Sequence, residues 1–125
     1  MKRNQILVVD DSIATRLMLS NILSANGYEV IDAENGKVAL DKLNAAKKRA
    51  GMIICDYNMP LMNGPEFAAK VRNLPDYRFI KIMMLTTEED QQKKDLAKNA
   101  GVSAWMKKSF KSESLLEAVK KLMGN

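Results

Sequence analysis

Two short apolar runs in this chain each end directly at acidic residues. Residues 6–9 are followed by Asp10 and Asp11, and residues 52–55 are followed by Asp56. Short runs rich in valine and isoleucine, bounded by turn signals, are typical of buried strands in a parallel sheet. Both acidic sites are therefore predicted at the carboxyl ends of strands, where open α/β sheets place their ligands. Three carboxylates at one edge repel one another unless a cation lies among them, and hard oxygen ligands favour Mg²⁺.

Strand-like segments alternate with segments of helical periodicity along the rest of the chain. Such alternation indicates βαβ units, so we expect an α/β fold in which five parallel strands carry helices on both faces. The helix over 88–100 has few apolar residues and is expected to be weakly anchored. Ser12 and Ser112 are expected to be N-caps of the first and last helices. Strands are predicted over 6–9, 28–33, 52–56, 80–85 and 102–106, and helices over 13–26, 39–50, around 67–71, over 88–100 and over 112–123.

Length and composition limit the classes of protein to be considered. The chain has 125 residues, so we expect one domain, 1–125. Its 46% apolar and 28% charged residues are ordinary values for a globular protein. The net charge is +5, but the basic pairs are scattered among acids, so we expect no nucleic-acid binding; an acidic protein partner is the alternative use of this charge. No apolar stretch approaches the roughly 18 residues of a membrane helix, and we expect no signal peptide before the first strand. We expect a cytoplasmic protein that does not bind membranes.

Two residue types exclude whole classes of chemistry. The single cysteine, Cys55, rules out an internal disulfide and a cysteine-based zinc site, and its apolar neighbours predict a core thiol. The chain has no histidine, which excludes a Ser-His-Asp triad and a histidine-ligated metal. No phosphohistidine can form within the chain itself.

Four motifs occur in order at the predicted strand ends. They are Asp10-Asp11-Ser12, Asp56 with Met59-Pro60 and Gly64, Thr86, and Lys108 with Phe110 two positions later. Taken singly, an acid pair is often a turn or cap, a lysine is often surface charge, and a threonine is often a helix cap. Taken together, they make the whole chain resemble the receiver domain of bacterial response regulators. Within that family the chain is most similar to the stand-alone, CheY-like chemotaxis regulators. The resemblance implies a flavodoxin-like, doubly wound (βα)5 fold with strand order 2-1-3-4-5.

The resemblance implies a role for each acidic residue. Asp56 would be the phosphoacceptor, taking a phosphoryl group from the phosphohistidine of a separate sensor histidine kinase or from a small donor. Mg²⁺ would be held by Asp11, Asp56 and the backbone carbonyl of Asn58, with Asp10 acting through a bound water. Because phosphoryl transfer depends on positioning and electrostatic stabilisation, these residue types suit the reaction.

Further residues would bind the phosphoryl oxygens and respond to them. By the same resemblance Lys108 supplies a point charge, and the Thr86 hydroxyl and the Thr87 backbone N–H donate hydrogen bonds. Lys107 could compete with Lys108, although the position of Phe110 favours Lys108. Thr86 would also move toward the phosphoryl group while Trp105 takes the space that it leaves; the alternative is a Trp105 packed permanently on the sheet.

Three further positions bear on the family pattern: one departs from it and two tune the reaction. Ser109 follows Lys108 where the family usually has a proline after a cis bond, so the bond is either cis at a cost of about 2.5–4 kcal/mol or trans with a different loop. Asn58 and Glu88 lie where the family tunes the access of hydrolytic water, and both predict a short-lived phosphoaspartate.

The expected function is a signalling switch rather than an enzyme. It would act as a monomer and bind a downstream target through the helix over 88–100, the strand over 102–106 and the last helix. One alternative is a phosphorelay intermediate that passes the phosphoryl group to a histidine phosphotransfer protein. Another is a phosphohydrolase of the haloacid dehalogenase type, which requires a second Asp where this chain has Asn58. An interaction module that is never phosphorylated is the remaining alternative.

Overall fold

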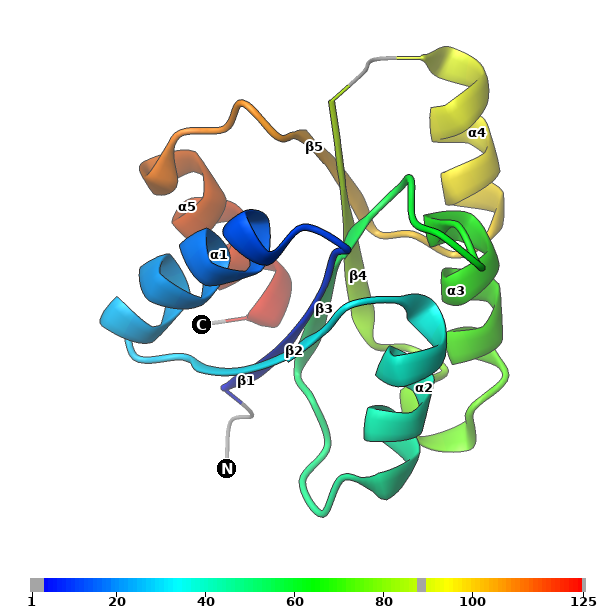
Figure 1. Cartoon of the computed structure of the whole chain (residues 1–125), viewed down its shortest axis with the longest axis horizontal. Coiled ribbons are helices and arrows are strands. Elements are labelled where there is room, and N and C mark those ends of the chain that lie inside the picture. Colours follow the sequence, from blue (N-terminus) through cyan, green and yellow to red (C-terminus); the bar gives the residue numbers. More distant parts are fainter. Residues whose placement is uncertain (1–3, 88–89, 125) are drawn as a thin grey trace.

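A parallel sheet forms the middle layer of the computed structural model, which describes residues 4–87 and 90–124 (Figure 1). The strand order is β2-β1-β3-β4-β5, as the resemblance implied, so the predicted fold class is confirmed. The strands are β1 (Gln5–Val9), β2 (Glu29–Ala33), β3 (Met52–Asp56), β4 (Lys81–Thr86) and β5 (Ala104–Lys107). The helices are α1 (Ile13–Ala25), α2 (Gly36–Ala45), α3 (Gly64–Arg72), the 3-10 helix η1 (Pro75–Tyr77), α4 (Gln91–Asn99) and α5 (Ser112–Met123).

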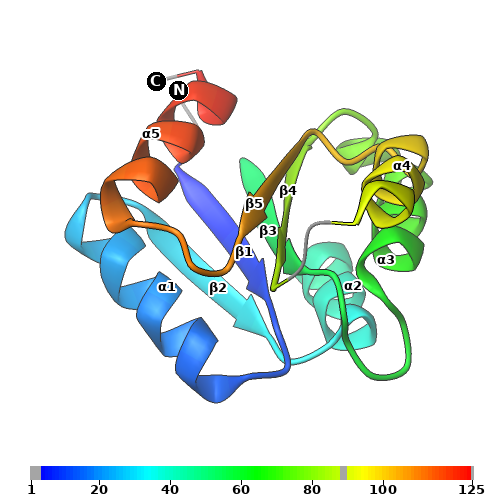
Figure 2. The same cartoon turned by 90° about the horizontal axis from the view of Figure 1, so that it is seen from above.

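Helices cover both faces of the sheet. Helices α1 and α5 lie on one face, and α2, α3 and α4 lie on the other, as Figure 2 shows from above. The strands β1 and β3 are buried along their whole length, because each has neighbours on both edges and helices on both faces. This is why their sequences are continuous apolar runs rather than alternating ones. Burial extends to the acids that follow: Asp10 and Asp56 are 0% and 6% exposed.

The described ends of several elements differ from the predicted ones. Ser112 is the first residue of α5 rather than its N-cap; Lys111 takes that position, with extended backbone and no side-chain cap. The prediction for Ser112 was therefore wrong, whereas Ser12 caps α1 through its hydroxyl, which accepts from the Thr15 N–H. Helix α2 ends at Ala45 because the backbone of Ala46 is already extended.

Helix α4 is as weakly anchored as its sequence predicts. Ala97 is its buried residue, and Leu96 is 57% exposed. Its N-cap is Asp90, whose carboxylate accepts from the backbone N–H groups of Gln92 and Lys93. The beginning predicted at Glu88 lies outside the described residues.

Within the described parts of the chain, each helix is too short or too polar to pass through a membrane.

Candidate functional site

The acidic residues meet at the carboxyl edge of the sheet because neighbouring strands run parallel. Val9 pairs with Cys55 in the register of β1 and β3, so the residues that follow, Asp10 and Asp56, emerge next to each other. One oxygen from each of Asp10, Asp11 and Asp56 lies within 4.8 Å of the others. Asp11 is exposed at the mouth of this group, whereas the other two are buried.

The three carboxylates fit a magnesium ion. Oδ1 of Asp10 accepts from the Ser12 N–H at 2.8 Å, but its buried Oδ2 accepts no hydrogen bond of good geometry. That oxygen faces the Lys108 ammonium instead, at 2.9 Å. A buried carboxylate oxygen with spare acceptor capacity, next to an exposed carboxylate, offers the all-oxygen ligands that Mg²⁺ prefers. The acidic group thus offers the ligands for the magnesium ion that the resemblance to receiver domains implied.

Lys108 reaches into this acidic group from the loop after β5. Its Nζ lies 2.9 Å from Oδ2 of Asp10 and 3.3 Å from Oδ2 of Asp56, and its backbone N–H donates to the Thr86 carbonyl at 2.7 Å. The Lys108–Ser109 bond is trans, so the reach of the lysine does not need a cis peptide here. Burial lowers the pKa of Lys108, but the bonds and charges of Asp10 and Asp56 outweigh it and raise the pKa overall. Lys107 is exposed, which leaves Lys108 as the lysine of the site.

The surroundings of Asp56 shift its pKa in opposite directions. Burial, and after it the neighbouring charge of Asp10, raise its pKa, which reaches about 6 when all neighbours are taken together. The Lys108 ammonium and a hydrogen bond from the Asn58 backbone oppose this shift without cancelling it. Positive charge in the site is therefore insufficient for the buried acids, and an additional cation would stabilise the ionised form.

The loop after β3 fixes the position of Asp56. The Gly64 N–H donates to the Tyr57 carbonyl at 2.8 Å, and a Cβ added to Gly64 would lie only 2.8 Å from the Asp56 carbonyl oxygen. Only glycine allows helix α3 to begin so close to the backbone of Asp56. Leu61 has φ +73, an uncommon left-handed conformation in the turn between Pro60 and Met62.

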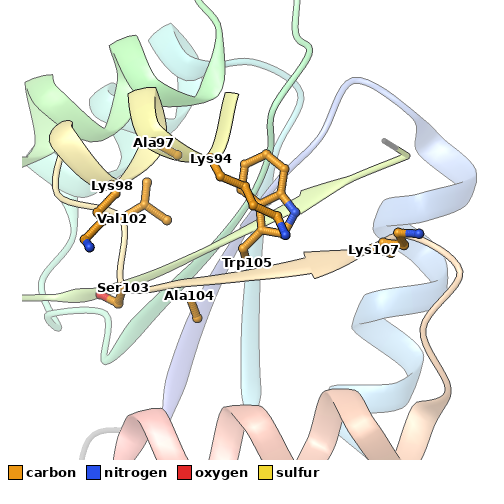
Figure 3. Close-up of a pocket in the computed structure, with 8 residues that line it drawn as sticks. All are labelled: Lys94, Ala97, Lys98, Val102, Ser103, Ala104, Trp105 and Lys107. Atoms are coloured by element: carbon orange, nitrogen blue, oxygen red, sulfur yellow. The ribbon is translucent and has the colours of Figure 1, made fainter. Parts of the chain in front are cut away.

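Trp105 lies beside the site, between β5 and α4 (Figure 3). Its ring meets the ring of Tyr57 edge to face, with centroids 5.8 Å apart, and Lys94 Nζ lies 5.9 Å from its centroid. The indole Nε1 is buried without a hydrogen-bond partner among the described residues. A cavity of about 380 Å³ opens next to the ring and is lined by Lys94, Ala97, Lys98, Val102, Ser103, Ala104, Trp105 and Lys107.

The remaining predicted residues lie around the rim. Thr86 is buried at the end of β4 beside Lys107 in the β4–β5 register, while Thr87 and Asn58 are exposed. Glu88 lies outside the described residues. Cys55 is a core thiol, as predicted; burial and then the charge of Asp56 raise its pKa well above the usual range.

Arg16 is a residue of the site that the sequence reasoning missed. Its Nη1 donates to the Asp10 carbonyl at 2.7 Å, and its Nε donates to Oδ2 of Asp32 at 2.9 Å. Arg16 thus connects the loop that contains Asp10 and Asp11 to the end of β2. The sequence signal that could have indicated this contact is an arginine near the start of the helix that follows the acid pair, together with Asp32 near the end of the second strand.

The chain matches known proteins over most of its length. A family model described as the response regulator receiver domain matches residues 6–120. The chain is 39% identical to the chemotaxis protein CheY1 of Helicobacter pylori over 121 residues, 96% of this chain and 97% of that protein. It is 36% identical to a chemotaxis protein CheY homolog of Campylobacter jejuni, covering 96% and 92%. The solved structure of Vibrio cholerae CheY4 matches with a TM-score of 0.91 and 42% identity, covering 96% and 98%.

Proposed function

Because the chain belongs to the family of response regulator receiver domains, whose CheY-like members are phosphorylation-activated switches rather than conventional enzymes, we propose that Asp56 is its phosphoacceptor. The observation that carries this proposal is the position of the Asp56 carboxylate. It lies close to the carboxylates of Asp10 and Asp11 and 3.3 Å from the Lys108 ammonium. A nucleophile, a set of oxygen ligands and a fixed positive charge thus share one edge of the sheet.

In the proposed reaction a carboxylate oxygen of Asp56 attacks the phosphorus of a phosphohistidine on a sensor histidine kinase. The new O–P bond makes an acyl phosphate, the N–P bond breaks, and the imidazole leaves with its electron pair. Lys108 stabilises the charge on the phosphoryl oxygens, and the Thr86 hydroxyl and Thr87 backbone N–H donate to them. The donor must come from another molecule, because this chain has no histidine.

The magnesium ligands in this proposal are Asp10, Asp11, Asp56 and the backbone carbonyl of Asn58. When bound, the ion neutralises the negative charge that would otherwise keep an anionic donor away from an anionic nucleophile. Asp10 is buried and paired with Lys108, so it suits an indirect role through water, whereas the exposed Asp11 is open to a direct one. Asn58 and Glu88 would control the approach of the water that hydrolyses the phosphoaspartate.

The proposed output is a change on the face formed by α4, β5 and α5. Thr86 would move toward the phosphoryl group and Trp105 would change its packing against Tyr57 and α4. Two observations support this: α4 is held by few buried residues, and a cavity lies directly beside Trp105. A downstream protein would bind this face, and the relatives named as chemotaxis proteins favour a chemotaxis pathway. We propose that the protein acts in the cytoplasm as a monomer and that residues 1–125 form one receiver domain.

Mapping of the modified residue tests this function. The protein is incubated with acetyl phosphate and Mg²⁺, and the phosphorylated peptide is identified by mass spectrometry in wild type and in Asp56→Asn. We expect phosphorylation at Asp56 in wild type and none in the variant, whereas Asp41→Asn, which changes an exposed acid on α2, is phosphorylated normally. Modification of another residue, or none in any variant, would show that the proposed function is wrong.

The downstream step needs a separate experiment. Radiolabelled phosphoprotein is mixed with candidate histidine phosphotransfer proteins and, in parallel, with candidate targets that carry no histidine acceptor. A terminal switch binds a target and loses its label to water. Rapid transfer of the label to a histidine would instead identify a phosphorelay intermediate.

A further inference from the structure

A second hollow lies at the edge of the sheet opposite Asp56. It is formed where the loop before β3 meets the segment before β4, since Met52 and Lys81 are paired at the starts of these strands. An ion pair of 2.5 Å between Arg49 and Asp76 joins the two segments. The hollow has a volume of about 380 Å³, and Phe79 is among the residues that line it.

Phe79 is held outward by a fixed backbone. Its side chain is 85% exposed, although the preceding Tyr77 is 5% exposed and packs into the core. Arg72 donates to the carbonyls of Tyr77 and Arg78 at 3.2 and 3.3 Å, and also to the Gly101 carbonyl at 2.6 Å. The Ile80 N–H closes the turn onto the Tyr77 carbonyl at 3.4 Å. These bonds limit how far the aromatic ring can turn toward the core.

Positive charge surrounds this ring. Arg78 and Lys81 flank Phe79 in the sequence, both are exposed, and within residues 4–87 and 90–124 no acidic side chain pairs with either. Asp76 is the acidic residue of the hollow, and Arg49 already occupies it. Arg49, Arg78, Phe79 and Lys81 are called the Phe79 surface below.

The composition of this surface fits a protein partner. Aromatic residues and arginine are enriched at protein interfaces, where a rigid aromatic side chain serves as an anchor and charged neighbours select a partner of opposite charge. A small ligand on Phe79 would keep one face in solvent, whereas small-molecule sites enclose most of their ligand. Arg78 and Lys81, which form no ion pair with the described residues, favour a partner that carries negative charge.

We propose that the Phe79 surface binds an acidic segment of a partner protein, with an apolar side chain of that segment packed on Phe79. The surface lies at the sheet edge away from Asp56, and this assignment does not depend on the proposed phosphorylation. It gives the chain a second binding surface, separate from the α4, β5 and α5 face.

A pair of synthetic peptides tests the proposal. One has a central Leu-Phe pair flanked by glutamates, and its control has glutamine at each glutamate position. Each is titrated into the whole isotope-labelled protein while backbone amide NMR signals are followed. We expect the acidic peptide to shift the amides of Gly51 and of residues 78–81 saturably, and the control peptide to bind about tenfold more weakly or not at all. Added salt should weaken the interaction, since the contact is between exposed charges.

Variants of the protein locate the contact. Phe79→Ser and the double variant Arg78→Glu with Lys81→Glu should each weaken peptide binding by about tenfold. Lys120→Glu, which changes an exposed lysine on α5, should not. Unchanged amide spectra outside the Phe79 surface show that each variant is folded.

Three outcomes would overturn the assignment. If the acidic peptide bound wild type and both variants equally strongly, the Phe79 surface would not be its binding site. Peptide shifts confined to α4 and β5 would lead to the same conclusion. Stronger shifts of the same amides by adenosine monophosphate would assign the surface to a nucleotide. Stronger shifts by vesicles that contain an anionic lipid would assign it to a membrane.

Discussion

Asp56 combines burial with a negative charge that its own neighbours only partly balance. Lys108 faces two carboxylates at once, Asp10 at 2.9 Å and Asp56 at 3.3 Å, so one positive charge serves two buried acids. Burial and, after it, the charge of Asp10 raise the pKa of Asp56 to about 6, because Lys108 offsets them only in part. The site therefore favours the binding of a cation. In metal-free protein, removal of the negative charge of Asp56 should make the fold more stable.

The raised pKa of Asp56 predicts a pH-dependent stability difference in metal-free protein. Since its folded-state pKa lies above the unfolded value, the protonated carboxyl stabilises the fold at low pH, and this contribution is lost as pH rises through about 6. Asp56→Asn should therefore be more stable than wild type by about 1–2 kcal/mol near neutral pH, with a smaller difference at about pH 4. Urea unfolding in the presence of a chelator measures this.

The exposed acid Asp41 provides the control for that measurement, because Asp41→Asn removes one charge without removing a buried one. Its stability should follow wild type at both pH values. If Asp56→Asn were less stable than wild type near neutral pH, the carboxylate would be stabilising the fold and our account of its environment would be wrong.

Helix α3 shows how an element carries the geometry of the site. Asn63 accepts from the Glu66 N–H, and Glu66 accepts from the Asn63 N–H, which makes a capping box that fixes where the helix begins. The next residue, Gly64, brings that beginning against the backbone of Asp56. A side chain there would collide with the Asp56 carbonyl oxygen as well as with the Met84 side chain, and the backbone carbonyl cannot turn aside as a side chain can.

Gly64→Ala should displace the loop that carries Asp56. The added Cβ would lie 2.8 Å from the Asp56 carbonyl and 2.4 Å from Met84 Sδ, so the backbone must shift. We expect a destabilisation of about 1–3 kcal/mol and a slower reaction with acetyl phosphate. Thermal unfolding and mass spectrometry of Asp56 measure the two effects.

Gly27→Ala is the matched control, since a Cβ there would meet no atom within 4 Å and its left-handed φ of +89 accounts for strain alone. This control should lose stability without losing phosphorylation. Phosphorylation of Gly64→Ala at the rate of Gly27→Ala would mean that the close contact does not position Asp56.

Helix α4 and strand β5 form the part of the fold best suited to change. Trp105 has a buried Nε1 without a partner among the described residues and ring contacts to Tyr57 and Lys94. We predict that its fluorescence changes when Mg²⁺ and beryllofluoride are added, and that Asp56→Asn shows no such change. If the spectrum were unchanged in protein whose Asp56 is demonstrably modified, Trp105 would take no part in the conformational change.

At the scale of the whole molecule, the two edges of the sheet carry different sets of side chains, and we propose a different function for each. The carboxyl edge collects the acids and Lys108, whereas the opposite, amino edge presents Phe79 beside Arg78 and Lys81, which form no ion pair with the residues that the structure describes. Parallel strands make this separation possible, because every strand ends at the first edge and begins at the second. A ligand bound at the carboxyl edge adds its binding free energy to the stability of the entire fold.

Mg²⁺ should raise the melting temperature near neutral pH. Binding to the folded state alone adds about 2.7 kcal/mol when free Mg²⁺ exceeds its dissociation constant a hundredfold. Asp11→Asn, which alters the exposed ligand of the group, should reduce this gain strongly and leave the metal-free melting temperature nearly unchanged. A gain of equal size in Asp11→Asn and wild type would place the ion elsewhere. Calorimetry with and without a chelator provides the data.

The strand and helix types were predictable because they depend on local patterns. The apolar runs before Asp10 and Asp56 indicated buried parallel strands, and their order along the chain brought both acids to one edge. Boundaries were less predictable: Ser112 looks like a cap, yet Lys111 has the extended backbone of the cap position, so the helix begins one residue earlier than a Ser112 cap would require. Cap positions depend on how the preceding loop approaches the helix, which neighbouring residues do not specify.

The apolar runs and the alternation of strands and helices were sufficient to group Asp10, Asp11 and Asp56 at one edge, and the resemblance to receiver domains added Lys108. Folding in three dimensions decided which lysine atom faces which carboxylate, that Arg16 bridges Asp10 and Asp32, and that Phe79 stays outside while Tyr77 is buried. These contacts join residues whose distance in space is set by the packing of helices on a twisted sheet. No local pattern encodes that distance.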